Sequence, residues 1–234
     1  MIKKLLLTLL TPALALVAID TASAAVVLPV GIEGFHQGDG APGGDGSITR
    51  AIDGSGMTKP DANAPATWTT AGSAWQDDWQ GFDTPGTSNE TWAVVDLGGP
   101  TANLDQMYLW NVNEGAHSDR GTNSFNIWYA TSPTLAPPTT GGTPTAYGFG
   151  SGGWTQLGGS LTLTQGSEAA GLSPDAFNIA GASGAQYIGI EMLTNHGAGD
   201  RTGLAEIAFT TVVPEPGSIA LVFVGLAGLL RRRR

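Results

Sequence analysis

The fold of this chain is decided by three short apolar runs that follow one another closely: WAVVDL (residues 92–97), LDQMYLWNV (residues 104–112) and NSFNIWYA (residues 123–130). In the third run Phe125, Ile127 and Tyr129 fall at every second position, so an extended strand would place them on one face. The first run is followed by two glycines and a proline, residues that favour turns, so we expect its strand to end there. Short apolar runs separated by turn residues predict an all-β domain.

The same pattern continues toward the C-terminus. We predict further strands at residues 154–157, 161–164, 176–180, 186–193 and 204–211. Within residues 186–193, Ile188, Ile190 and Met192 would face the core. No sustained helical period of apolar residues occurs between residues 25 and 213. These features predict an antiparallel two-sheet β-sandwich, with a jelly roll as its more specific version.

Two stretches have the composition of loops. Residues 31–46 are polar and glycine-rich, so we interpret residues 25–47 as an N-terminal segment that precedes a domain at residues 48–211. Residues 132–153 contain four prolines, six glycines and no charge. That composition is unsuited to packing a core, and it predicts a long surface insertion between strands.

The first 24 residues have the three parts of a secretory signal peptide. Lys3 and Lys4 are followed by an apolar stretch at residues 5–19 and then by Ala22-Ser23-Ala24, a run of small residues. We therefore predict export of the chain and cleavage by signal peptidase after Ala24.

The last 23 residues, 212–234, also have three parts. Pro214, Glu215 and Pro216 precede a charge-free apolar run at residues 217–230, and four arginines end the chain: Arg231, Arg232, Arg233 and Arg234. The run has 14 residues (230 − 216). As a helix it is about 21 Å long, which is short for a bilayer core of about 30 Å. It could span only with help from the flanking valines and from snorkelling arginines, which would stay on the cytoplasmic side. This arrangement predicts transient insertion into the inner membrane.

The order of these three parts closely resembles the PEP-CTERM sorting signal of Gram-negative bacteria, which is associated with producers of exopolysaccharide. The resemblance implies that an exosortase-type protease cuts near Pro214, Glu215 and Pro216 and then releases or re-anchors the body. The protein would then be secreted or displayed on the cell surface. An ordinary C-terminal membrane anchor is the alternative.

Without its two ends the chain has 189 residues (213 − 24), enough for one well-packed domain. That body keeps four basic residues (10 − 6) and 18 acidic ones (20 − 2), so its net charge is 4 − 18 = −14. A body this acidic repels phosphate backbones, so we expect no nucleic-acid partner. Acidic surfaces suit calcium, although acidity also simply keeps a secreted protein soluble. Cysteine is absent, which excludes disulfides and thiol chemistry.

Several short motifs between residues 48 and 209 follow the order seen in discoidin domains, the coagulation factor C-type modules of the galactose-binding-like superfamily. In order they are Ala51-Ile52-Asp53-Gly54, Thr67-Trp68, WAVVDLG (residues 92–98), Leu109-Trp110-Asn111 and Gly203-Leu204-Ala205-Glu206-Ile207. Two further stretches resemble the bacterial branch of that group: Asp119-Arg120-Gly121 leading into Phe125-Asn126-Ile127, and Thr194-Asn195-His196-Gly197 before the last strand. The chain departs from this family in the insertion at residues 132–153 and in the long stretch between Trp68 and Trp92.

The discoidin resemblance implies a structural calcium ion held by Asp53, Thr67 and Glu206 together with backbone carbonyls. Asp53 precedes Gly54 at a turn where glycine permits a positive φ, so the chain can curl around an ion. The alternative is that Asp53 only forms the turn and that Glu206 pairs with Arg50 or Arg201.

The resemblance to sugar-binding relatives also implies a carbohydrate site on loops gathered at one end of the sandwich. Such sites combine an aromatic platform with planar polar groups. The predicted platform is Trp75 or Trp79, and the predicted hydrogen-bonding residues are His117, Arg120, Asn195 and His196. The alternative is that the arginines pair with nearby acids and the tryptophans are buried.

Together these features predict a lectin-like module that binds extracellular polysaccharide and is not an enzyme. The three histidines are isolated in the sequence, and neither HExxH nor GxSxG occurs. Two alternatives remain. The chain could be a structural matrix or biofilm protein without a sugar site, or a glycan-active hydrolase with two carboxylates across a cleft.

Overall fold

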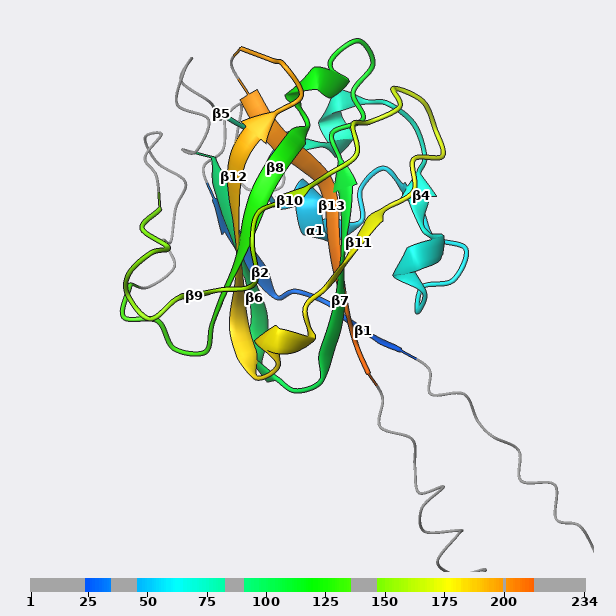
Figure 1. The fold of residues 1–234 in the computed structure, drawn as a ribbon. Coiled ribbons are helices and arrows are strands. Elements are labelled where there is room, and N and C mark those ends of the chain that lie inside the picture. Colours follow the sequence, from blue (N-terminus) through cyan, green and yellow to red (C-terminus); the bar gives the residue numbers. More distant parts are fainter. Residues whose placement is uncertain (1–23, 35–45, 83–90, 136–146, 200, 213–234) are drawn as a thin grey trace, which may run out of the picture. The chain divides into compact units, whose positions relative to one another are not determined.

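Two antiparallel sheets face each other in the computed structural model, which describes residues 24–34, 46–82, 91–135, 147–199 and 201–212 (Figure 1). The five-stranded sheet consists of β1 (Ala25–Val27), β5 (Trp79–Phe82), β7 (Leu104–Asn111), β11 (Asp175–Asn178) and β13 (Arg201–Thr211). The six-stranded sheet consists of β2 (Gly31–Gly34), β6 (Trp92–Thr101), β8 (Thr122–Ala130), β9 (Thr155–Gln156), β10 (Leu161–Thr162) and β12 (Ala185–Asn195).

The remaining elements are short and lie in the connections. A two-stranded ribbon pairs β3 (Met57–Thr58) with β4 (Thr69–Thr70), and α1 (Arg50–Asp53) is a helix of one turn. Within the described residues there are also four 3₁₀ turns: η1 (Pro65–Thr67), η2 (Trp75–Asp77), η4 (Ser118–Arg120) and η5 (Ala180–Ala182).

Each sheet is organised around one long strand. β13 pairs with β7 along one edge, and along its other edge it pairs with β5 at its start and with β1 at its end. β12 lies between β6 and β8. The two-sheet antiparallel sandwich predicted from the sequence is therefore confirmed, and a strand is present at each of the eight predicted places.

The core between the sheets follows the predicted alternation. Ile188, Ile190 and Met192 of β12 are each 0% exposed, and Phe125 and Ile127 of β8 face the same core. The prediction of the strand end after Leu97 is wrong, because β6 continues through its two glycines to Thr101.

The glycine-rich N-terminal segment was wrongly predicted to be a loop at residues 31–34. These residues form β2, which pairs with β6, and Ile32 packs in the core. A Cβ on Gly34 would collide with Ile48 and with the Trp92 carbonyl, so this glycine permits close packing rather than flexibility. Because β1 and β2 join different sheets, the sandwich begins at Ala25 rather than at Ile48.

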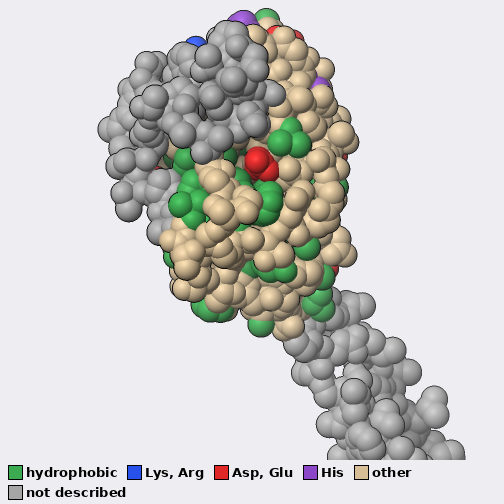
Figure 2. All heavy atoms as spheres, turned by 60° about the vertical axis from the view of Figure 1, so that its left-hand side comes forward, with side chains coloured by type: hydrophobic (Ala, Val, Ile, Leu, Met, Phe, Trp, Pro, Cys, Tyr) green, Lys and Arg blue, Asp and Glu red, His purple; other side chains and the backbone are tan. Residues whose placement is uncertain are grey.

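The insertion at residues 132–153 also differs from its prediction. Phe149 is 1% exposed and packs with Trp92, Val94 and Trp154 in a second hydrophobic cluster, on the six-stranded sheet. Phe149 stacks on Trp128 at 5.8 Å between ring centroids, and a Cβ on Gly189 would collide with it. Figure 2, which brings the β9 side of the molecule forward, shows hydrophobic side chains gathered around one acidic side chain. The described part of the insertion therefore contributes Leu135, Tyr147 and Phe149 to the cover of this sheet face.

One end of the sandwich carries the long loops, and at the other end the first and last strands pair with each other. β13 runs from Arg201 at the end where long loops gather to Thr211 at the other end, where Ala25 pairs with Thr211 (Figure 1). Eleven residues of strand extend roughly 33 Å, so the loops lie far from the point where both termini leave.

Residues 1–23 of the predicted signal peptide and the sorting residues Pro214, Glu215, Pro216 and Arg231 to Arg234 lie outside the described residues. In the part of the chain that the structure describes, no helix is long and apolar enough to cross a membrane.

Candidate functional site

Four loops are tied together at the end of the sandwich opposite the termini. The backbone N–H of Gly115 donates to the Ser73 carbonyl at 3.1 Å, and the backbone N–H of His196 donates to the Asp119 carbonyl at 3.0 Å. The hydroxyl of Ser118 donates to Oε1 of Glu168 at 2.8 Å. The loop at residues 112–121 is therefore the central one. We use the name loop end for this loop together with the three loops that contain Ser73, Glu168 and His196.

Glu114 joins the polar side chains of the loop end. Its Oε2 accepts hydrogen bonds from Nε2 of Gln80 at 2.7 Å and from Nη1 of Arg120 at 3.0 Å. Arg201 donates to Oε1 of the same Gln80 at 3.4 Å. The guanidinium of Arg120 is thus paired with an acid, as the alternative to the sugar site supposed. A guanidinium has five N–H donors, so further donors of Arg120 are left to other partners.

Asp78 and Asn113 hold the base of this network. Asp78 is 4% exposed, and its Oδ2 accepts from the backbone N–H of Asn113 at 2.8 Å. Burial raises the pKa of Asp78 to about 7, with the Asn113 N–H opposing and the charges of Glu114 and Asp77 adding to the rise. The amide of Asn113 donates to the carbonyls of Gly72 and Ala169 at 2.8 and 2.6 Å. Asp78 and Asn113 therefore hold the loops in place by hydrogen bonds.

The two predicted aromatic platforms have different positions. Trp75 in η2 is 41% exposed and stays a candidate for stacking on a sugar. Trp79 is 0% exposed, so its prediction as a platform is wrong. The physical reason is that Trp79 begins β5 and pairs with Leu204 of β13, which places its ring in the core.

The predicted hydrogen-bonding residues also divide. His117 is exposed at the turn before η4. Asn195 donates from Nδ2 to the carbonyls of Ala198 and Arg201, both at 2.8 Å, and so shapes its own loop. Nε2 of His196 lies 3.0 Å from the Leu163 carbonyl. Among the predicted sugar-binding residues, Trp75 and His117 are therefore the ones whose side chains are exposed to solvent. The sugar site itself stays a prediction.

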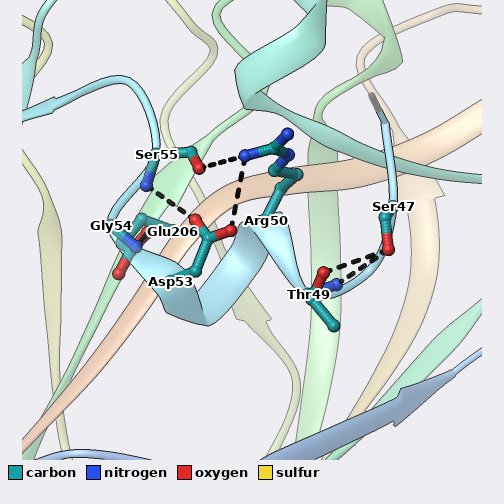
Figure 3. A network of polar contacts seen from close by, with 7 residues as sticks. All are labelled: Ser47, Thr49, Arg50, Asp53, Gly54, Ser55 and Glu206. Atoms are coloured by element: carbon teal, nitrogen blue, oxygen red, sulfur yellow. Dashed lines mark hydrogen bonds and ion pairs between the residues drawn. The ribbon is translucent and has the colours of Figure 1, made fainter. Parts of the chain in front are cut away.

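At the predicted calcium corner, Asp53 acts as a turn-former. Its Oδ1 accepts from the backbone N–H of Ser55 at 2.7 Å, and its Oδ2 lies 3.5 Å from Nη1 of Arg50. Figure 3 shows the Asp53 carboxylate directed toward these two groups. Gly54 closes the helix at φ 78°, the left-handed conformation that favours glycine.

Glu206 is the buried carboxyl of this corner. It is 2% exposed, and its Oε2 accepts from the backbone N–H of Gly54 at 3.0 Å. Its Oε1 lies 3.9 Å from Nζ of Lys59, a partner that sequence reasoning missed. Burial raises the pKa of Glu206 to about 8, while Lys59 and the Gly54 N–H oppose the rise and Asp53 adds to it.

The third predicted ligand, Thr67, is exposed, and its hydroxyl donates to the Ala64 carbonyl at 2.8 Å. Calcium takes six to eight oxygen ligands. Here the Asp53 and Thr67 oxygens have other partners and an ammonium stands beside Glu206. No group of three or more His, Cys, Asp or Glu in the described part of the chain could hold a metal ion. The side chains at this corner, as they lie here, do not fit calcium. The calcium ion implied by the sequence stays a prediction.

Sequence reasoning also missed Glu191, on the face of the six-stranded sheet that carries the second cluster. Its Oε2 accepts from Nε1 of Trp128 at 2.8 Å and from Nδ2 of Asn126 at 2.9 Å. Glu191 alternates with the core residues Ile190 and Met192, so the period of the strand already places it on the opposite face.

Comparison with known proteins gives one family match and a set of similar folds. Residues 212–234 match the PEP-CTERM protein-sorting motif. No curated protein matches the chain. The F5/8 type C domain of a Bacteroides fragilis protein is 17% identical, with a TM-score of 0.48, and the match covers 82% of this chain and 99% of that domain.

Two further solved structures are similar to a comparable extent. A fucose-binding module of Streptococcus pneumoniae is 13% identical, with a TM-score of 0.45 and coverage of 80% of this chain and 96% of the module. A chitosan-binding module from a Paenibacillus chitosanase/glucanase is 16% identical, with a TM-score of 0.41 and coverage of 80% and 98%. The chain thus carries a PEP-CTERM protein-sorting motif at residues 212–234, after a β-sandwich whose structural neighbours are F5/8 type C and carbohydrate-binding modules.

Proposed function

We propose that this chain is an exported, surface-sorted module that binds extracellular polysaccharide through its loop end and catalyses no reaction. The observation that carries the proposal is the loop end itself. There, exposed Trp75 and His117 share a set of mutually bonded loops with the network of Glu114, Gln80 and Arg120.

This arrangement suits a sugar for two physical reasons. An exposed indole offers an apolar face on which a pyranose ring can stack. The loops are already joined by hydrogen bonds, so a ligand orders few side chains when it binds and loses less affinity to conformational entropy.

The sorting motif follows β13 in the chain, at residues 212–234. An exosortase-type protease would cut near residues 214–216, next to the end of β13 that lies opposite the loops. The residues that would be cut therefore follow the end of β13 in the chain, whereas the loop end lies at the start of that strand. Cleavage, re-anchoring and the Gram-negative cell surface belong to this proposal.

Retention of the full chain on immobilised polysaccharides, including matrix from the producing strain, tests the proposal. We expect retention on at least one polymer and a loss of affinity of about tenfold or more in Trp75→Ala, because the indole loses its stacking surface. Leu28→Ala is the matched control, since Leu28 is also exposed but lies on the connection between β1 and β2. Failure to bind any polymer would contradict the proposal.

A structural matrix protein without a sugar site is the second candidate. It is favoured by the internal use of Asn195, His196 and Arg120, whose polar atoms bond within the fold. It predicts equal retention of the wild type and Trp75→Ala. Release of soluble sugar from the polymers would instead indicate the glycan-active hydrolase.

A further inference from the structure

Lys59 is the one lysine between residues 25 and 213, and it lies at the corner where the sequence predicts calcium. It directly follows β3, and its ammonium stands between an acid and an aromatic ring. Nζ lies 3.9 Å from Oε1 of Glu206 and 4.1 Å from the ring centroid of Trp68. The side chain is 29% exposed, so its charge is partly shielded from water.

The aromatic surroundings of this ammonium are tightly packed. Trp68 is 2% exposed and stacks on Trp110, which is 0% exposed, at 5.9 Å between ring centroids. The indole of Trp68 donates from Nε1 to the Asp61 carbonyl at 2.6 Å, which fixes the ring beneath the lysine. A cation over an indole face is attracted by the ring quadrupole, so this site favours a positive charge.

The backbone at Gly54 leaves room for the same ammonium. A Cβ at residue 54 would collide with Nζ of Lys59, and the Gly54 N–H donates to the other oxygen of Glu206. The turn that would curl around an ion therefore packs against the end of the lysine side chain. A divalent cation brought beside Glu206 would meet this ammonium at close range, and like charges repel.

We propose that the ammonium of Lys59 supplies, from within the chain, the positive charge that the discoidin resemblance assigns to calcium, so that this corner takes no calcium. Lys59 thereby joins the ribbon of β3 and β4 to the five-stranded sheet through Glu206 and Trp68.

Thermal unfolding of the full chain in mild detergent, followed by tryptophan fluorescence, tests the first part. We expect the Tm in millimolar calcium chloride to equal the Tm in EGTA within about 1 °C, because a ligand raises the Tm only where it binds the folded state. Glu206→Gln is the control, since Gln keeps an acceptor for the Gly54 N–H. A calcium-dependent rise in Tm that disappears in Glu206→Gln would overturn the proposal, whereas a rise that persists would place the ion elsewhere and support it.

Two lysine variants test the second part. Lys59→Met keeps most of the apolar stem on Trp68 but removes the charge, and we expect its Tm to fall by about 5 °C. Lys59→Arg keeps a cation that can lie over the ring, and we expect it to recover at least half of that loss. A Tm of Lys59→Met within about 1 °C of the wild type would overturn the role of the charge.

Discussion

The loop end and the corner around Glu206 each bury one carboxyl group beneath a backbone N–H, but the charged groups beside the two carboxyls differ. Glu206 has an ammonium 3.9 Å away and an indole beside that ammonium. Asp78 has two acids, Glu114 and Asp77, that raise its pKa further. The corner thus contains its own counter-charge, whereas the loop end accumulates acid and balances it with amide groups and with Arg120.

This difference indicates separate roles for the two regions. A buried carboxyl group whose pKa is raised and that has an ammonium of the same chain beside it needs no cation from outside. At the loop end, the polar groups are joined to one another across loops, and the outermost side chains remain exposed. The loop end is therefore the region where a ligand can add contacts.

The largest effect that we expect is a fall in stability between pH 5 and pH 9. Burial raises the pKa of Asp78 from 3.8 to about 7 and that of Glu206 from 4.5 to about 8. Between each pair of values the folded protein holds a proton that the unfolded chain has lost, so stability falls as the pH rises. The combined loss should be on the order of 7 kcal/mol, about 3 from Asp78 between pH 5 and 7 and about 4 from Glu206 between pH 5 and 8, measured by urea unfolding across this range.

Two variants divide this pH effect between the regions. Asp78→Asn and Glu206→Gln cannot titrate, and each should flatten the profile, Asp78→Asn mainly below pH 7 and Glu206→Gln up to pH 8. Stability that stays level or rises from pH 5 to pH 9 in the wild type would show that these carboxyl groups are ionised at little cost.

The next effect concerns the side-chain amide of Asn113, which joins three loops of the loop end. Asn113 is 1% exposed, donates to two carbonyls and to Thr70, and accepts from the backbone N–H of Glu168 at 2.9 Å. Asn113→Ala leaves these buried groups unpaired and should cost about 3 kcal/mol of unfolding free energy. Denaturant titration measures this cost. The control Asn126→Ala removes a half-buried amide of the six-stranded sheet and should cost less than half as much.

The strands could be predicted from the sequence because their faces repeat every second residue. Ile188, Ile190 and Met192 are assigned to the core by that period alone, and the structure buries all three. The same approach failed for the insertion at residues 132–153, because prolines and glycines dominate its composition. That composition gave no sign that Phe149 is buried. Its ring stacks on Trp128, which lies 21 residues earlier in the chain (149 − 128).

The candidate site could be predicted only in outline, because side-chain roles depend on partners distant in the sequence. Trp75 and Trp79 look alike as two tryptophans among small polar residues, yet Trp79 pairs with Leu204 and is buried. Lys59 and Glu206 are 147 residues apart (206 − 59), and no local pattern joins them. The motif order singled out Glu206, but the basic partners that the sequence suggested for it were Arg50 and Arg201 and not Lys59.

The smallest effect that we expect comes from neutralising Glu114, the carboxylate that joins Gln80 and Arg120 at the loop end. Glu114→Gln keeps an oxygen that can accept from Arg120 or Gln80 but removes the negative charge, so the partly exposed ion pair loses about 0.5 kcal/mol of unfolding free energy. One acid fewer beside Asp78 should also lower the pKa of that carboxyl, since the Glu114 charge helps to raise it. The pH at which stability falls most steeply should therefore move down in Glu114→Gln and stay unchanged in Glu168→Gln, whose carboxylate bonds Ser118 instead. If both variants moved the profile equally, net charge rather than contact with Asp78 would govern it, and the loop end would not be the connected unit that its hydrogen bonds describe.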